Sequence, residues 1–276
     1  MRQSVLFWIL AVVITILTAY YQRVTGPTYP VSGTVSLNEK MISYTLDRSH
    51  AGPTNAPVKV KTDDASIQGE VSWKRYRTDD DWTSVPLKYE DGFLVAELPH
   101  QLPAGKLLYK LELRQEDQRV KVPGPDPIAI RFRGDMPMWI FIPHLVAMFA
   151  AMLLSTRAGL EYFSKEPQFR RMTYWTLGFL FVGGFIFGPL IQYSAFNTWW
   201  TGWPFGTDLT DNKTAVAFIA WVVAGIALSR AKHPKRWVLG AAIILIVVYL
   251  IPHSVLGSEL DYRGLNKQGT TMEKTQ

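Results

Sequence analysis

The sequence predicts a membrane protein that combines an α-helical transmembrane bundle with an all-β domain. Two observations support this fold class. Residues from about 22 to 136 are polar and rich in Pro and Gly, whereas most of the remaining chain is apolar. Basic residues cluster in short loops beside the apolar segments, which is typical of a membrane protein with a defined orientation. We therefore expect an anchor helix over 1–24, a β-domain over 25–136, a bundle over 137–257 and a tail over 258–276.

The N-terminal segment is predicted to be an uncleaved signal anchor. Arg2 precedes a run over 5–19 that contains no charged residue. A cleaved signal peptide would need small residues after this run, but Tyr20 and Tyr21 stand there. Paired tyrosines followed by Gln22 and Arg23 are typical of an interfacial anchor.

The β-domain is predicted from the alternation of apolar and polar residues. Leu107, Tyr109, Leu111 and Leu113 alternate along one segment, so they share one face of a strand. We expect seven or so short strands, including one over 34–46, separated by turns rich in Asp, Gly and Pro. This spacing is typical of an antiparallel β-sandwich.

Trp73 lies in a predicted mid-domain strand, and Leu102-Pro103 leads to Tyr109. These residues resemble the core Trp and the tyrosine corner of immunoglobulin and fibronectin type III domains. The resemblance covers this domain alone. It implies an Ig/FnIII-like sandwich with Trp73 in its core, and it implies no activity.

Four further apolar segments, at about 138–155, 172–193, 214–229 and 237–255, are each near the length that crosses ~30 Å of hydrocarbon. The basic residues fall in the loops that join the first to the second and the third to the fourth: Arg157, Lys165, Arg170 and Arg171, then Arg230, Lys232, Lys235 and Arg236. The positive-inside rule places both loops in the cytoplasm. We expect five crossings of the cytoplasmic (inner) membrane, the N-terminus inside, and the β-domain and C-terminus outside.

Composition and motifs exclude several function classes. The chain has no cysteine, so disulfides, thiolate metal sites and Fe–S clusters are excluded. The net charge of +6 is modest, and its placement indicates membrane orientation rather than nucleic-acid binding. We find no GxSxG, HExxH, Walker or dinucleotide motif, so hydrolase, protease and nucleotide-driven activities have no local support.

A Trp-rich loop over 193–214 lies on the predicted outer side, and it carries Asp208 and Asp211. The predicted topology brings His144 and His253 to the same level of the membrane. Ionisable residues at membrane depth are costly, so these four residues form the candidate site. We expect Asp208 to cap the helix that follows and to be the carboxylate nearest the histidines. We expect Asp211 to be used at the helix terminus.

Four uses of this site remain open. Two imidazoles and carboxylates could bind a divalent transition metal ion through His144, His253, Asp208 and Asp211. The two histidines could instead be axial ligands of one haem b. The set could be a purely structural polar network with no cofactor, or it could bind a quinone or a lipid headgroup.

The glycines at 178, 183, 184 and 188 could line one helix face for close helix packing or could leave room for a flat cofactor. The sequence therefore predicts an integral membrane protein that is a non-catalytic subunit of a membrane complex. It would present an outer docking domain, with the lipid bilayer and other protein subunits as partners. The alternatives are a b-type haem electron-transfer subunit and a membrane metalloenzyme, so whether the chain is an enzyme stays open.

Overall fold

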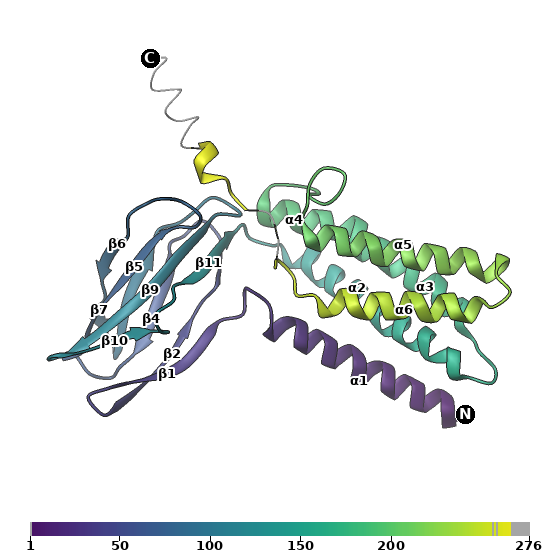
Figure 1. Ribbon diagram of the computed structural model, residues 1–276, viewed down its shortest axis with the longest axis horizontal. Coiled ribbons are helices and arrows are strands. Elements are labelled where there is room, and N and C mark those ends of the chain that lie inside the picture. The colour runs from purple at the N-terminus through teal and green to yellow at the C-terminus, as the bar shows by residue number, and fades with distance from the viewer. Residues whose placement is uncertain (1, 256, 258, 266–276) are drawn as a thin grey trace, which may run out of the picture. The chain divides into compact units, whose positions relative to one another are not determined.

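The computed structural model describes residues 2–255, 257 and 259–265 and divides into two compact units. A helical unit comprises residues up to Pro27 and the stretch Met136–Ser258. A β unit comprises Thr28–Asp135 and the chain from Glu259 onward. The segment 259–265 therefore belongs with the β unit instead of forming a separate tail, and residues 266–276 lie outside the described part (Figure 1).

The β unit contains two sheets. One sheet has the strand order β1-β2-β4-β8-β7, and the other has the order β3-β11-β9-β5-β6 with β10 also paired to β9. Neighbouring strands are antiparallel except β3 and β11, which are parallel. The strands are β1 Val31–Leu37, β2 Lys40–Leu46, β3 Ser49–Ala51, β4 Ala56–Lys61, β5 Gln68–Arg75, β6 Thr83–Pro86, β7 Lys88–Glu90, β8 Phe93–Leu98, β9 Lys106–Gln115, β10 Gln118–Val122 and β11 Ile128–Arg133.

The single strand predicted over 34–46 is a hairpin of β1 and β2. Asn38 and Glu39 form its turn and both have positive φ, at 47° and 65°. Two consecutive residues with φ above zero are typical of the tight turns that match strand twist, and Asn tolerates this conformation better than most residues. The prediction was wrong because the turn contains no Gly or Pro to mark it in the sequence.

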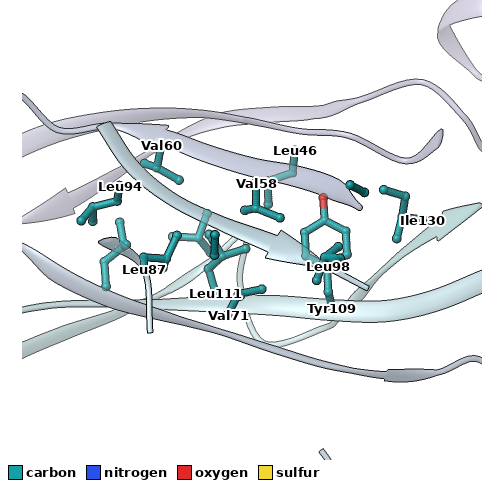
Figure 2. Packing of buried hydrophobic residues seen from close by; sticks show 14 of the residues in the cluster. Leu46, Val58, Val60, Val71, Leu87, Leu94, Leu98, Tyr109, Leu111 and Ile130 are labelled. Atoms are coloured by element: carbon teal, nitrogen blue, oxygen red, sulfur yellow. The ribbon is translucent and has the colours of Figure 1, made fainter. Parts of the chain in front are cut away.

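Both sheets contribute to one hydrophobic core. Val58, Val60 and Leu94 come from the first sheet, while Leu111 and Ile130 come from the second (Figure 2). The alternation predicted for the segment around Tyr109 is confirmed, because Leu107, Tyr109, Leu111 and Leu113 are all buried in β9. Two layers that share a core give the sandwich-like arrangement that the sequence predicts.

The aromatic residues of this core differ from the expectation. Trp73 is only partly buried and packs at the edge of the cluster, so the prediction that it forms the core is wrong. Phe132 and Tyr109 are the fully buried rings, with 0% and 1% of their surfaces exposed. The Tyr109 hydroxyl donates a 2.7 Å hydrogen bond to the carbonyl of Asp47, and burial raises the pKa of Tyr109. This bond spans 62 residues, whereas a tyrosine corner bonds a few residues upstream.

The helical unit consists of α1 Arg2–Val24, α2 Met138–Leu160, α3 Phe169–Phe181, α4 Gly188–Phe196, α5 Leu209–Arg230 and α6 Pro234–Leu250. A short 3₁₀ helix, η1, covers Glu161–Phe163, and a π-helix, η2, covers Val182–Phe187. Because η2 joins α3 to α4, the three form one helical stretch over Phe169–Phe196. Within the described residues, four helices are long and apolar enough to cross a membrane: α1, α2 with η1, the Phe169–Phe196 stretch, and α5.

Most neighbouring helices of this unit are antiparallel, whereas α1 and α6 run in the same direction. Helix α2 contacts α3 and α6, α5 contacts α3 and α6, and α1 lies against α2 and α6 (Figure 1). Short connections impose the reversal between α2 and α3 and between α5 and α6, while the whole β unit separates α1 from α2 in the sequence. One end of the unit therefore gathers the C-termini of α1, α4 and α6 and the N-termini of α2 and α5. We call it the Trp-loop end and the opposite one the basic end.

Phe132→Ala should destabilise the β unit by ~3–5 kcal/mol, because it removes a fully buried ring from the shared core. Trp73→Ala should cost clearly less, since that ring is only partly buried. Urea unfolding of the soluble fragment 28–135, followed by far-UV circular dichroism, measures both losses. An equal loss in the two variants, or a helical spectrum from the wild-type fragment, would contradict this core.

Candidate functional site

His144 lies in the second turn of α2 and donates from Nδ1 to the Gly183 carbonyl of η2 at 2.9 Å. A carbonyl oxygen only accepts, so the hydrogen bond places a proton on Nδ1. In the neutral ring, Nε2 then has a lone pair that can accept a hydrogen bond or bind a metal ion. The structure therefore fixes the tautomer of this histidine.

The local sequence explains why Gly183 can accept this bond. Pro189 follows η2 and has no N–H, so regular α-helical bonding cannot continue through it. The chain forms a π-turn instead, and the Gly188 N–H bonds to the Gly183 carbonyl five residues earlier. A Cβ at position 183 would lie 2.7 Å from Sδ of Met148, so glycine allows α2 to approach closely enough for His144 to reach the carbonyl.

Lys213 is a buried cation in the second turn of α5, with 6% of its surface exposed. Its Nζ donates a 2.5 Å hydrogen bond to the carbonyl of Ile251, just after the end of α6. Gln22 of α1 also donates to this carbonyl at 3.3 Å and to that of Tyr249 at 2.8 Å. Cations are stabilised near helix C-termini, where carbonyls lack partners within the helix. Three helices are therefore joined through the last carbonyls of α6.

His253 lies in the turn after α6, and its side chain is exposed. Lys213, His144 and Asp208 all act electrostatically on its imidazole. The backbone N–H of the next residue, Ser254, is 3.4 Å from the Thr210 hydroxyl at the start of α5. The structure thus brings both predicted histidines to the Trp-loop end, with Asp208 as the carboxylate that acts on His253.

Asp208 is the N-cap of α5 and accepts from the Thr210 N–H at 2.8 Å, as the sequence predicts. The expectation that Asp211 would be used at the helix terminus is wrong. Its Oδ2 accepts from the backbone N–H of Thr201 at 2.7 Å and of Gly202 at 3.0 Å. A Cβ at position 202 would lie 2.6 Å from that of Asp211, so the glycine makes this close approach possible.

Further hydrogen bonds hold the Trp-rich loop closed. Asn212 accepts from the Trp203 N–H at 2.6 Å, and the Asp208 N–H donates to the Thr201 carbonyl at 2.9 Å. Gln192 of α4 donates to the Thr201 hydroxyl at 2.6 Å. This framework leaves three rings outside: Trp199, Trp203 and Phe205, of which the last two are 78% and 82% exposed.

Sequence reasoning missed Lys213, because it placed the start of the helix at residue 214 and assigned the lysine to the loop. A usable signal existed. After Arg23, Lys213 is the one basic residue that the predicted topology puts at the outer end of a membrane segment. The positive-inside rule does not favour a basic residue on the outer side, so such a residue needs a local partner. Here that partner is the C-terminus of α6.

Some of the side chains that could bind a metal ion are present at the Trp-loop end. Nε2 of His144, the ring of His253 and the carboxylate of Asp208 are the ligand types that suit a divalent transition metal. The part of the chain that the structure describes contains no group of three or more His, Asp or Glu side chains placed to hold a metal ion. The buried ammonium of Lys213 also acts on His253, and a dication there would face its charge.

The glycines at 178, 183, 184 and 188 have different surroundings. A Cβ on Gly183 would meet Met148 and Ala147 of α2, and one on Gly184 would lie 2.7 Å from Cγ2 of Thr214 in α5. Close packing is therefore confirmed at these two positions, and neighbouring side chains occupy the space a flat cofactor would need there. Gly178 faces open space.

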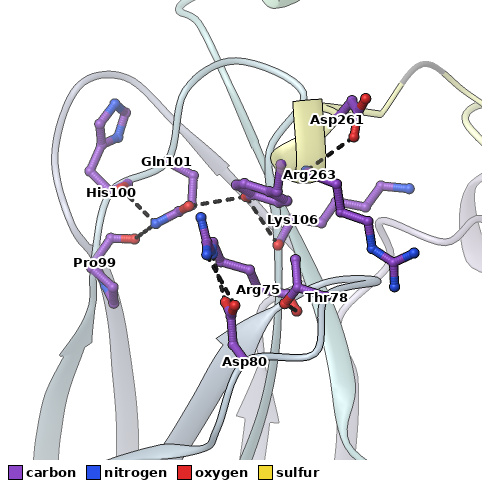
Figure 3. Close-up of polar contacts among 10 residues, drawn as sticks. Arg75, Thr78, Asp80, Pro99, His100, Gln101, Lys106, Asp261 and Arg263 are labelled. Carbon is purple, nitrogen blue, oxygen red and sulfur yellow. Dashed lines mark hydrogen bonds and ion pairs between the residues drawn. The ribbon is translucent and has the colours of Figure 1, made fainter. Parts of the chain in front are cut away.

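A second polar cluster belongs entirely to the β unit and surrounds a cavity of about 580 Å³. Glu259 contacts Lys106 at 2.6 Å and Arg77 at 2.8 Å, and Arg75 contacts Asp80 at 2.6 Å. Figure 3 shows Asp261 bonded to the turn at Arg263, with Gln101 and Lys106 alongside. Ion pairs thus hold the segment 259–265 against the sheets, and Glu259, which follows His253 in sequence, has its partners in the β unit.

Tyr262 connects this segment to the sheet. Its hydroxyl bonds to Oε1 of Gln101 at 3.0 Å and to the Lys106 carbonyl at 3.2 Å. Burial raises the pKa of Tyr262 to about 12, so the phenol stays protonated and can donate at neutral pH.

A comparison of the chain with protein-family models, with curated proteins and with solved structures gives no match in any of the three.

Asp211→Asn should destabilise the Trp-rich loop by roughly 1.5–3 kcal/mol, because a charged acceptor of two backbone N–H groups is lost. Asp208→Asn is the matched control, since Asn caps helices about as well as Asp and the net charge changes equally. Limited proteolysis of the loop and thermal unfolding in detergent measure the difference. Equal sensitivity of the two variants would contradict the assigned role of Asp211.

Proposed function

We propose that the protein is a non-catalytic subunit of a membrane complex and that its Trp-loop end and β unit are docking surfaces. One observation carries this proposal: the polar side chains at the Trp-loop end are engaged with backbone groups. His144 bonds to Gly183, Lys213 to Ile251, and Asp211 to Thr201 and Gly202. Such a network fixes helix ends and a loop, and it presents Trp199, Trp203 and Phe205 on a rigid support.

The orientation that this function needs is supported by the distribution of basic residues. The basic end carries those of the two connecting loops and the adjacent helix termini, whereas Arg23 and Lys213 are at the Trp-loop end. The positive-inside rule then favours a cytoplasmic basic end, an outer Trp-rich loop and an extracytoplasmic β unit in the inner membrane.

Five crossings are part of this proposal. Helix α6 has 17 residues, which span about 26 Å at 1.5 Å per residue and fall at the short end of the transmembrane range. It packs between α2 and α5, so it can cross with them. An immunoglobulin-like assignment of the two sheets also remains a proposal, and it would suit a docking domain.

The exposed rings favour a protein partner as well as the bilayer. Aromatic side chains at membrane interfaces normally anchor a helix at headgroup level. Here Trp203 and Phe205 project from a loop that Asp211 and Asn212 hold in place. Large aromatic residues on a rigid support lose little entropy on binding and are enriched at the centres of protein interfaces.

Photo-crosslinking in native membranes tests the docking role. A photoreactive residue in place of Phe205 should capture a second polypeptide at a discrete mass. Ile219, which is 60% exposed in the middle of α5, is the matched control and should yield lipid adducts. Adducts with lipid alone from both positions would contradict docking through the loop.

The second candidate function is a metal or haem site at His144 and His253. It is favoured by the fixed tautomer of His144, which keeps Nε2 available for a ligand, and by the position of His253 at the same end of the unit. Asp208 would supply charge to a metal. For haem, the packing at Gly183 and Gly184 leaves no room beside those residues.

Metal analysis and an absorption spectrum of the purified protein decide between the candidates. Docking alone predicts no stoichiometric metal and no Soret band. If metal co-purifies at one equivalent, is lost in both His144→Ala and His253→Ala, and is kept in His233→Ala, the second candidate replaces the first. His233 is the control because it lies before α6 at the opposite end of the unit.

A further inference from the structure

An apolar groove of about 710 Å³ opens on the helical unit near the basic end. Helix α1 packs against α2 and α6, while α3 packs against α2 and α5, so α1 and α3 lie on either side of α2. The groove lies between these three helices. Trp8 comes from α1, Leu154 from α2, and Trp175 and Phe179 from α3, with Pro167 and Gln168 closing one end.

The lining residues lie at matched depths. Trp8 is six residues after the start of α1 at Arg2, Trp175 is six after the start of α3 at Phe169, and Leu154 is six before the end of α2 at Leu160. At 1.5 Å per residue each lies about 9 Å from its helix end. Phe179 is ten residues into α3, about 15 Å deep, and its ring stacks on that of Trp175 at 5.9 Å. The groove therefore runs from the helix ends into the hydrocarbon zone.

Two arginines stand at the shallow end of the groove. Arg170 and Arg171 are the second and third residues of α3, and both side chains are exposed. One Nη of Arg170 donates to the Leu228 carbonyl at 2.9 Å, which orients its guanidinium. Arg171 makes no hydrogen bond or ion pair with any residue that the structure describes. Guanidinium groups bind phosphate oxygens in bidentate fashion, and basic clefts between membrane helices suit anionic headgroups.

A buried ion pair also stabilises the shallow end of the groove. Arg157 of α2 pairs with Glu161 through Nη1 and Oε1, and both side chains are almost fully buried. The other oxygen of Glu161 accepts from the Gln168 N–H at 2.9 Å, which holds the segment that closes the groove. Arg157 also stacks over the rings of Phe7 and Trp8, at 5.4 and 5.3 Å, so the same cation positions the α1 wall. The groove is therefore a built feature of the unit.

We propose that this groove binds one anionic phospholipid. Arg171 and Arg170 hold the phosphate, and an acyl chain lies along Trp8, Leu154, Trp175 and Phe179. Charge complementarity selects an anionic lipid over a zwitterionic one, and the depth of the groove selects a lipid over a free phosphate. This site is at the basic end, so it is independent of the function proposed for the Trp-loop end.

Native mass spectrometry of the full chain in detergent, titrated with phosphatidylglycerol or phosphatidylcholine, tests the proposal. Phosphatidylglycerol should bind as one retained lipid and phosphatidylcholine should not. Arg171→Gln should weaken phosphatidylglycerol binding roughly fivefold, and Arg170→Gln with Arg171→Gln should weaken it further, since one cation near a lipid surface contributes about this factor. Leu154→Trp, which fills the groove and keeps both cations, should also reduce retention.

The matched control is Arg230→Gln with Arg236→Gln, which removes two arginines from the same end of the unit but outside the groove. It should leave binding unchanged. Equal retention of the two lipids, loss in the control as large as in the groove variant, or displacement of the lipid by millimolar inorganic phosphate would overturn the proposal. Unfolding temperatures of all variants are compared, and Arg171→Gln, whose side chain has no described partner, should match the wild type.

Discussion

Backbone groups at helix ends and at the π-turn determine where several polar side chains of the helical unit lie. Inside a bilayer there is little water to satisfy such groups, so protein donors must reach them. Lys213 and Gln22 reach the last carbonyls of α6, and His144 is a second donor to the Gly183 carbonyl, which also accepts from the Gly188 N–H. The same need explains why Asp211 turns away from its own helix, because the N–H groups of Thr201 and Gly202 would otherwise have no charged acceptor.

Much of the architecture follows from the sequence because apolar length and strand alternation are local signals. The long apolar segments and the buried face of β9 needed only the spacing of their own residues. The features that differ from the sequence-based expectation depend on contacts between segments distant in sequence. Whether Trp73 or Phe132 fills the core is decided by how two sheets meet, and the hairpin turn at Asn38 uses a residue that tolerates positive φ without a Gly signal.

In the candidate site, too, features set by the local sequence could be predicted, and contacts between distant segments could not. The placement of both histidines at one end, and the cap at Asp208, could be predicted from segment direction and capping preference. The partner of His144 could not, because it is a backbone carbonyl of a π-turn 39 residues away. Lys213 was overlooked for a related reason, since its partner is the end of α6 and only the packed unit places that carbonyl beside α5.

The two ends of the helical unit stabilise buried charge in different ways. At the basic end Arg157 and Glu161 neutralise each other, and their remaining bonds reach Ser4 and Gln168. At the Trp-loop end Lys213 bonds to a carbonyl at the C-terminus of α6, and the carboxylate of Asp208 also acts on its charge. A helix C-terminus stabilises a cation through partial negative charges, whereas a carboxylate in an ion pair does so through a full one. The buried cation at the Trp-loop end therefore depends on the packing of α5 against α6, while Arg157 at the basic end depends on a residue of its own helical stretch.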